Sequence, residues 1–203
     1  MNYLHFKSLL KNTPFFSINM IRLHAPTFRV DQLMRWQQKG LIRPIMRGWY
    51  LFQEEPLTEA LLMLIANKLI TPSYISLEFA FSLYNLIPEG VFQITSITSK
   101  KTQCHETPFA TFNYRHLKAS LLFGYHLRET PYGNLCIADA EKAILDFLYL
   151  TSAANHQNFF DEMRLNQVVL KTLDFDKFKN YLAAFKNNAL EKRFKRLLDY
   201  VTH

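Results

Sequence analysis

The sequence predicts an α+β protein of two domains, the first over residues 1–53 and the second over residues 57–203. Three observations support this prediction: the length of 203 residues, a step in charge near residue 54, and a change from helical to extended patterning near residue 91. A hydrophobic content of 49% is ample for packed cores, and a charged content of 20% is ordinary for a soluble protein.

The charge of the chain is concentrated in its first quarter. Residues 1–53 contain eight Lys or Arg side chains and one acidic side chain, Asp31, and therefore carry the whole formal net charge of +7. The other residues contain sixteen basic and sixteen acidic side chains, which sum to zero. A cationic segment at one end of a neutral chain is typical of a protein that binds a polyanion, and DNA is the expected partner.

Three helices are expected in the first domain, over residues 3–12, 18–23 and 28–39. Ser17 precedes the second helix and Thr27 the third, as N-capping residues do. The segment LIRPIMRGWYLF that follows predicts a short strand, a tight basic tip around Arg43–Gly48 and a returning aromatic strand. This order of helices and hairpin is that of a winged helix-turn-helix.

The third helix is the expected DNA-recognition element. Its period places one set of side chains inward, namely Val30, Leu33, Met34 and Gln37, with Trp36 at the margin. The residues expected to meet bases or phosphates are Thr27, Arg29, Asp31, Gln32 and Arg35, together with Arg43 and Arg47 on the wing. If the protein neutralises roughly five phosphates, the logarithm of its DNA affinity should fall with the logarithm of the salt concentration with a slope of about −4 to −5. The alternative is a protein-interaction module, because winged helices also bind proteins.

The second domain is predicted to be a mixed α/β domain with antiparallel strands and a helical tail from about residue 156. Helices are expected over residues 57–70, 73–85, 139–150, 175–185 and 190–201. Strands are expected over residues 91–98, within 105–116, and as a pair over 121–128 and 135–137.

The segment ITSITSKKT (residues 94–102) is the most distinctive part of the second domain. Its hydroxyl side chains alternate with isoleucines, which predicts a strand with one buried and one polar face, and Lys100 and Lys101 lie at its end. The polar strip is either an interaction surface or a strand with a solvated tip.

The sequence favours a protein without catalytic, metal or cofactor sites. The histidines and cysteines of the second domain (Cys104, His105, His116, His126 and Cys136) match no closed zinc-site spacing, and the five glycines are too isolated to form a phosphate-binding loop. Asp139, Glu141 and Lys142 resemble part of a nuclease site, but the acids fall at a helix start, where Asp139 is expected to cap the helix and Glu141 to complement its dipole. Lys142 and Asp146 are expected to form an ordinary i,i+4 pair, and a nuclease would use Asp139, Glu141 and Asp146. A metal-dependent nuclease is the weaker alternative.

A cytoplasmic protein without a membrane segment is expected. The longest apolar run, over residues 60–66, is too short to span a bilayer, and the first residues lack the features of a signal peptide. Two cysteines form no disulfide framework.

Several blocks of the sequence are similar, in order, to one known family. They are KGLIRPIMRGWYL (39–51), YISLEFAFSLYNLIPEGVFQITSITSKKT (74–102), TPFATFNYRHLK (107–118), FGY (123–125) and IADAEKAILDFLYL (137–150). Together they resemble the AbiEi family, the antitoxins of bacterial abortive-infection, type IV toxin–antitoxin systems. The resemblance covers residues 1 to about 150.

The resemblance implies an antitoxin and transcriptional autorepressor for phage defence. Its winged helix would bind repeats in the promoter of its own operon through Arg29, Gln32, Arg35, Arg43 and Arg47. Its second domain would counteract a nucleotidyltransferase toxin of the AbiEii type, a functional partner whose direct binding stays open. Antitoxicity is assigned to Lys100, Lys101 and Arg115 from their polarity. The wing departs from a strongly basic pattern, because it contains Pro44 and Met46.

Overall fold

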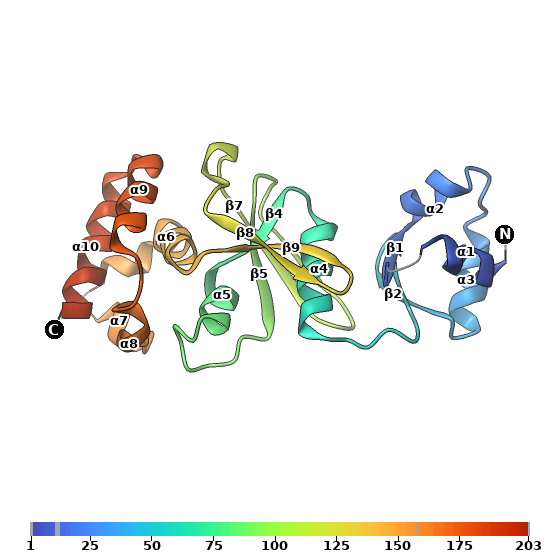
Figure 1. Ribbon diagram of the computed structural model, residues 1–203, viewed down its shortest axis with the longest axis horizontal. Coiled ribbons are helices and arrows are strands. Elements are labelled where there is room, and N and C mark those ends of the chain that lie inside the picture. Colours follow the sequence, from blue (N-terminus) through green and yellow to red (C-terminus); the bar gives the residue numbers. More distant parts are fainter. Residues whose placement is uncertain (1, 11–12, 157, 203) are drawn as a thin grey trace.

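The computed structural model describes residues 2–10, 13–156 and 158–202 and is a mixed α+β structure with two separate sheets. Figure 1 shows an elongated molecule whose termini lie at opposite ends. The N-terminal helices and the smaller sheet occupy one end, the larger sheet lies in the middle, and the C-terminal helices occupy the other end. Lys11 and Asn12, which the sequence places in the first helix, lie outside the described residues.

The first unit contains three helices and a three-stranded antiparallel sheet. Its elements are, in chain order, α1 (Tyr3–Leu9), β1 (Phe15–Ser17), α2 (Ile18–His24), α3 (Asp31–Gln38), β2 (Ile42–Met46) and β3 (Trp49–Phe52). The strands lie in the order β1-β3-β2. The three helices and the hairpin agree with the sequence prediction, whereas β1 is not predicted, because a three-residue strand is too short to show alternation.

The N-caps of the first unit are only partly as predicted. Ser17 does cap α2, since its hydroxyl oxygen accepts a hydrogen bond from the Met20 amide at 3.2 Å. The prediction for Thr27 is wrong: α3 begins at Asp31, with Val30 at the N-cap position. The chain first makes a turn in which the Phe28 amide donates to the Ala25 carbonyl, and this turn buries the Phe28 ring.

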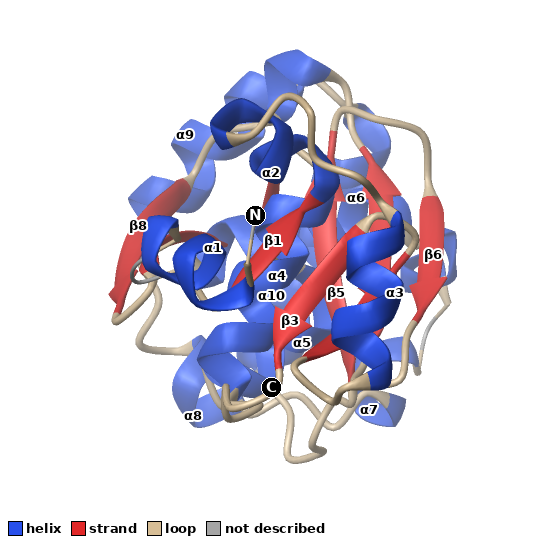
Figure 2. Cartoon of the chain, turned by 90° about the vertical axis from the view of Figure 1, so that its right-hand side faces the viewer, coloured by secondary structure: helices blue, strands red, loops and turns tan. Residues whose placement is uncertain are grey.

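Side chains alternate across the smaller sheet, and both of its faces are covered. The even-numbered residues face the three helices and belong to an aromatic-rich cluster with Phe6, Leu33 and Trp36; they are Phe16, Ile42, Tyr50 and Phe52. The odd-numbered residues face the second unit; they are Phe15, Ile45, Trp49 and Leu51. Figure 2 looks at the molecule from this end and shows α1, α2 and α3 in front of the smaller sheet.

The second unit is built on a six-stranded mixed sheet with the strand order β6-β7-β5-β4-β9-β8. Its elements are α4 (Glu59–Leu69), β4 (Ser73–Ile75), α5 (Leu77–Leu83), β5 (Gln93–Thr98), β6 (Gln103–Glu106), β7 (Thr111–His116), the 3-10 turn η1 (Ala119–Leu121), β8 (Tyr125–Thr130), β9 (Gly133–Ala138) and α6 (Ala140–Leu150). The predicted β8–β9 hairpin is confirmed. Two pairs, β4–β9 and β5–β7, are parallel, which the sequence prediction did not include.

The predicted helix over residues 73–85 is wrong in its first turn. Ser73–Ile75 forms β4, and the helix begins only at Leu77. Tyr74 and Ile75 are both buried, and they pack into the apolar clusters on opposite faces of the sheet. Pairing with β5 and β9 therefore overrides the helical pattern of the sequence.

Helices cover both faces of the larger sheet. On one face α4 packs between the sheet and the first unit, and on the other face α5 and α6 pack, followed by the C-terminal helices. The C-terminal elements are η2 (Ser152–Asn155), α7 (Phe159–Glu162), α8 (Gln167–Leu170), α9 (Phe175–Phe185) and α10 (Asn188–Thr202). Within the described residues, no helix combines the length and apolar character that crossing a membrane requires.

The odd-numbered face of the smaller sheet and α4 share one apolar cluster, which we call the interface cluster. Its members include Phe15, Ile45 and Leu51 from the first unit and Leu61, Leu64 and Ile65 from α4. The two units are therefore held together by apolar packing as well as by the segment that connects Phe52 to α4.

Truncating Leu51 should destabilise the protein, because this side chain is 0% exposed and lies in the interface cluster. We expect Leu51→Ala to lower the free energy of unfolding by about 2–5 kcal/mol, the usual cost of such a cavity. Urea unfolding followed by circular dichroism measures the loss. Leu57→Ala, at a position that is 40% exposed, is the control and should cost less than about 0.5 kcal/mol. Equal losses in the two variants would contradict the packing described.

Candidate nucleic-acid interface

Helix α3 presents a mixed polar and apolar face to solvent. Leu33 and Trp36 are buried, and Trp36 contacts the rings of Tyr3, Phe6 and Phe28. Val30 and Met34, which the sequence placed inward, are instead 42% and 62% exposed. The large Trp36 ring, which the sequence placed only at the margin, is buried in the aromatic cluster. The side of α3 that carries Trp36 therefore faces the core.

Two arginines beside α3 share one carboxylate. Asp31 accepts a hydrogen bond from Arg29 Nε at 3.1 Å and from Arg35 Nη2 at 3.4 Å. Both arginine side chains stay largely exposed, so these ion pairs contribute little to stability. Their effect is to hold two guanidinium groups on the solvent side of the helix.

The other residues predicted on this helix are placed differently. Thr27 is exposed in the turn before α3. Gln32 is half-buried, and its Oε1 atom has no hydrogen-bond partner among the residues that the structure describes. The structure therefore brings together three of the predicted residues, Arg29, Asp31 and Arg35, on an exposed surface, and Thr27 is nearby in sequence.

The hairpin separates its two arginines. Arg47 is exposed in the two-residue turn between β2 and β3, where Gly48 adopts a positive φ of 83°. Arg43 points the other way, toward the second unit: its Nη2 donates to the Glu55 carbonyl at 2.7 Å, and its guanidinium lies 5.2 Å from the centre of the Phe109 ring. Arg43 is thus an interface residue, apart from the exposed cations.

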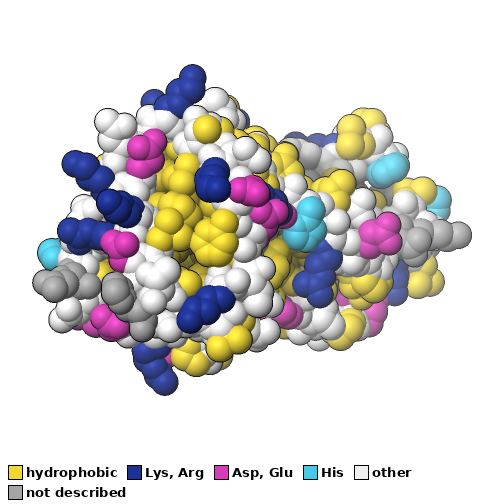
Figure 3. Space-filling model, turned by 60° about the vertical axis from the view of Figure 1, so that its left-hand side comes forward, with side chains coloured by type: hydrophobic (Ala, Val, Ile, Leu, Met, Phe, Trp, Pro, Cys, Tyr) yellow, Lys and Arg dark blue, Asp and Glu magenta, His cyan; other side chains and the backbone are white. Residues whose placement is uncertain are grey.

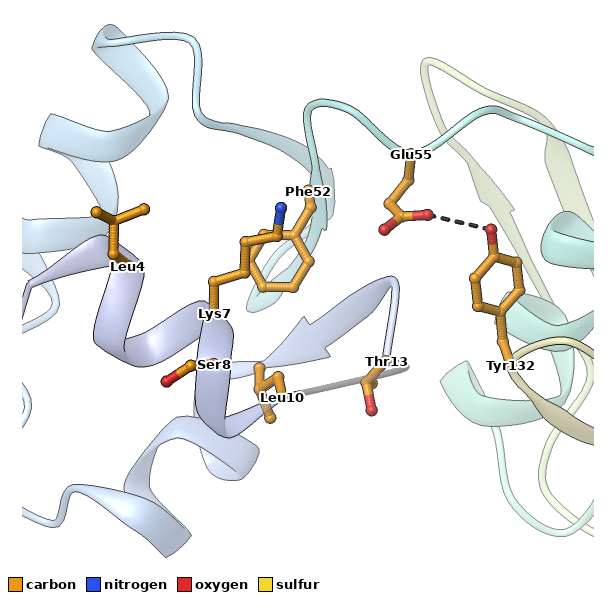
Figure 4. A pocket seen from close by; sticks show the side chains of 8 residues that line it. All are labelled: Leu4, Lys7, Ser8, Leu10, Thr13, Phe52, Glu55 and Tyr132. Carbon is orange, nitrogen blue, oxygen red and sulfur yellow. Dashed lines mark hydrogen bonds between the residues drawn. The ribbon is translucent and has the colours of Figure 1, made fainter.

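A surface pocket of about 350 Å³ lies beside this interface (Figure 4). Lys7 from α1 and Tyr132 from the β8–β9 turn line it from opposite units. Tyr132 donates to Glu55 Oε2 at 3.1 Å, and Lys7 forms an ion pair with Glu54. Lys7 thus joins the first unit, and Tyr132 the second unit, to the segment that connects Phe52 to α4.

The structure places the three antitoxicity candidates near one edge of the larger sheet. Strands β5 and β7 are parallel, and Arg115 lies opposite Ile97 near their carboxyl ends. Lys100 and Lys101 follow β5 and are exposed, and the Lys100 carbonyl lies 2.9 Å from His116 Nδ1. Arg115 also lines a surface pocket of about 470 Å³ together with Asn113 and Phe92.

The hydroxyl side chains of β5 do not form an exposed strip. Residues 94–98 are all buried, because β5 is a central strand covered on both faces. Thr95 donates to the Ser76 carbonyl and Thr98 to the Pro72 carbonyl, both at 2.6 Å. The predicted polar face is therefore wrong, and the exposed residues of the segment, Lys100, Lys101 and Thr102, all follow the strand.

The acidic residues of α6 are used for packing. Asp139 makes no side-chain cap within the described chain; its carboxylate accepts hydrogen bonds from Tyr181 at 2.7 Å and His126 at 3.1 Å and pairs with Lys177 at 2.8 Å. Glu141 accepts a hydrogen bond from the Asp174 amide at 3.0 Å. These contacts join α6 to the start and first turns of α9. Among the described residues, no group of three or more His, Cys, Asp or Glu is placed to hold a metal ion.

The i,i+4 pair of Lys142 and Asp146 that the sequence predicts is present, but it lies in the core. Both side chains are 0% exposed, and Tyr74 and Ser76 each donate to Asp146 Oδ2 at 2.9 Å. Burial raises the pKa of Asp146 and lowers the pKa of Lys142, because each charged form loses its water, while the opposite charge beside it counteracts the shift. The pair is a polar element of the core, satisfied by its neighbours.

Figure 3 shows the surface of the second unit, where cationic and acidic side chains are interspersed around an apolar hollow. This mixture agrees with the zero net charge of the chain beyond residue 53. The exposed cations of the first unit, in contrast, have one acidic neighbour within residues 1–53, Asp31.

Removing Arg43 should affect stability, because its guanidinium is engaged at the interface. We expect Arg43→Gln to lower the free energy of unfolding by about 1–3 kcal/mol through the loss of a charge-assisted hydrogen bond. Arg47→Gln, at an exposed position of the same hairpin, is the matched control and should cost less than about 0.5 kcal/mol. Urea unfolding of both variants tests the assignment, which is wrong if Arg47→Gln is the more destabilising change.

Asp139 should stabilise the fold in a pH-dependent way. Burial alone opposes its ionisation, but the hydrogen bonds from Lys177, Tyr181 and His126 hold its pKa below the usual value. A carboxyl with a lowered folded pKa stabilises the protein above its unfolded pKa of about 4, and the contribution is lost as the pH falls through the folded value.

The expected result for Asp139→Asn is a loss of about 1–3 kcal/mol in unfolding free energy at neutral pH. The difference from the parent protein should shrink as the pH falls below the unfolded pKa and through the lowered folded pKa, where the parent carboxyl becomes protonated. Urea titrations at neutral pH and at a series of acidic pH values measure this, and a difference that stays constant would show that the charge of Asp139 contributes nothing.

Comparison of the chain with protein-family models finds no match, and comparison with curated proteins finds no significant match either.

Proposed function

We propose that this protein is a DNA-binding autorepressor and antitoxin of a type IV toxin–antitoxin operon, as its resemblance to the AbiEi family implies. The observation that carries the proposal is the placement of exposed arginines on and before α3 and at the β2–β3 turn, in the unit that holds the whole net charge. Such a surface is complementary to the phosphate backbone of DNA.

The topology of the first unit supports a winged helix-turn-helix. The order α1-β1-α2-α3-β2-β3, with strands arranged β1-β3-β2, provides a helix pair followed by a hairpin. In helix-turn-helix proteins the second helix of the pair enters the major groove, which here is α3. Arg47 at the hairpin turn would then contact the DNA backbone beside the groove.

The interface between the units supports the same orientation. The odd-numbered face of the smaller sheet is buried against α4, so the helical side of the first unit is the side left for DNA. Of the four arginines and one glutamine that the resemblance implies, we retain Arg29, Arg35 and Arg47 as phosphate or base contacts. Arg43 is excluded from this set because it is bound to Glu55 and Phe109.

The second unit is proposed to counteract a nucleotidyltransferase toxin. The support is the two exposed lysines that follow β5, Lys100 and Lys101, with Arg115 on the neighbouring strand β7. Such cations suit an acidic protein segment or a nucleic acid. We assign no catalytic role to Asp139, Glu141 or Asp146, since each is bound within the helical packing.

A toxin-binding first unit is the second candidate. Leu23, Val30 and Met34 are exposed on the α2–α3 surface, and exposed apolar side chains are common at protein interfaces. Co-elution of the antitoxin and toxin through this surface, with no salt-sensitive DNA binding, would favour this candidate over the autorepressor.

Charge reversal at two exposed arginines should strongly weaken DNA binding. In the variant Arg35→Glu/Arg47→Glu, two of roughly five phosphate contacts become repulsive, and we expect affinity to fall by at least about 10-fold. Fluorescence anisotropy measures it on duplex DNA from immediately upstream of the protein's own operon, beside a scrambled duplex, at two salt concentrations. The parent protein should bind the native duplex alone tightly, with a log–log salt slope of about −4 to −5.

The control variant is Lys192→Glu/Lys195→Glu, which makes the same change in net charge at exposed positions of α10. It should keep the parent affinity, and both variants should keep the parent melting temperature. Unchanged affinity in the Arg35/Arg47 variant would refute the proposed site, and equal weak binding of the parent protein to both duplexes would refute an operator-specific repressor.

A further inference from the structure

The solvent side of α3 carries a row of apolar and amide side chains. Val30 and Met34 are 42% and 62% exposed and lie one helical turn apart, and the exposed Gln38 lies one turn further. Residues four apart share one side of a helix. The row is fixed in this direction, because Leu33 and Trp36 hold the opposite side of α3 in the core.

Cations border the row. The side chains of Arg29 and Arg35 are 78% and 70% exposed, and each gives one hydrogen bond to Asp31. A guanidinium has five N–H donors, so each arginine keeps donors for a further partner. Apolar side chains flanked by exposed cations are complementary to a base edge flanked by phosphates, which identifies the occupant as duplex DNA rather than an apolar protein surface.

The chemistry of the row fits one kind of base pair. Thymine is the base that presents a methyl group in the major groove, and adenine presents a donor and an acceptor that one amide side chain binds together. Two apolar side chains and a glutamine therefore match T·A pairs. Guanine, in contrast, is bound best by an arginine or a lysine at the same position.

We propose that α3 selects T·A base pairs in the major groove. Val30 and Met34 contact thymine methyl groups, and Gln38 bonds to an adenine base edge. The inference rests on the proposed DNA-binding function, and it adds which bases the site selects and which side chains select them.

The test compares duplexes that differ only in the methyl group. The probe is the duplex from immediately upstream of the protein's own operon, prepared with thymine or with uracil, which lacks the methyl. We expect the parent protein to bind the uracil duplex about 4-fold more weakly for each thymine methyl group that Val30 or Met34 would otherwise cover, from about 0.8 kcal/mol per buried carbon group. Val30→Ala/Met34→Ala should bind the thymine duplex more weakly than the parent and should bind both duplexes equally.

The control is Leu127→Ala, which removes an apolar side chain of similar exposure (61%) from β8 of the second unit. It should keep the parent preference for thymine. Any effect of uracil on DNA shape is common to all variants, so the comparison between parent and double variant isolates the methyl contact.

The outcomes separate this inference from the function on which it rests. Equal binding of the parent protein to both duplexes would overturn the base assignment and leave DNA binding standing. A thymine preference that persists in Val30→Ala/Met34→Ala would overturn the role of these side chains. Absence of binding to either duplex would overturn the proposed function and the inference together.

Discussion

Two-sided packing of the three-stranded sheet is the constraint on which the arrangement of this protein depends. Because side chains alternate along each strand, Phe16, Ile42 and Phe52 face the three helices while Phe15, Ile45 and Leu51 face the second unit. One face completes the core of the first unit, and the other completes the interface cluster. A sheet with one apolar face would have left the first unit without this attachment.

This constraint decides which side of the first unit is free. The odd-numbered face is buried against α4 and cannot take part in recognition without separating the units. Helix α3 lies on the opposite side, and Arg35 and Met34 extend from it into solvent. The same alternation assigns Arg43 to the interface, since it shares the parity of Ile45 and Leu51. The exposed cationic surface is therefore smaller than the number of basic residues suggests.

The core of the second unit contains a buried ion pair in addition to aromatic rings. Lys142 and Asp146 lie fully inside the core, where Tyr74 and Ser76 complete their hydrogen bonds, and the aromatic rings of Phe123 and Phe185 lie 4.9 Å from the Lys142 ammonium group. Removing one partner of such a pair leaves an uncompensated buried charge. The pair lies within α6, and the hydrogen bonds that Tyr74 and Ser76 donate to Asp146 join α6 to β4 and the residue after it. Together with the Asp139 contacts to α9, it makes α6 the element that connects the larger sheet to the C-terminal helices.

The features of this protein that depend on local physics could be predicted from the amino-acid sequence. Periodicity and capping located α2, α4, α6, α9 and α10, turn residues located the β2–β3 and β8–β9 hairpins, and counting charges located the cationic unit. The features that depend on contacts between residues far apart in the chain could not be predicted in this way. Tyr74 is in a strand because β5 and β9 bind it on either side, and α3 exposes Met34 because the Trp36 ring fits the aromatic cluster better. Arg43 is not among the proposed DNA contacts for the same reason. Its guanidinium packs on the Phe109 ring, which lies far along the chain. One signal in the sequence did indicate that both faces of the smaller sheet are covered. The strand Trp49–Phe52 is apolar throughout, and a strand that is covered on both faces needs no polar alternation.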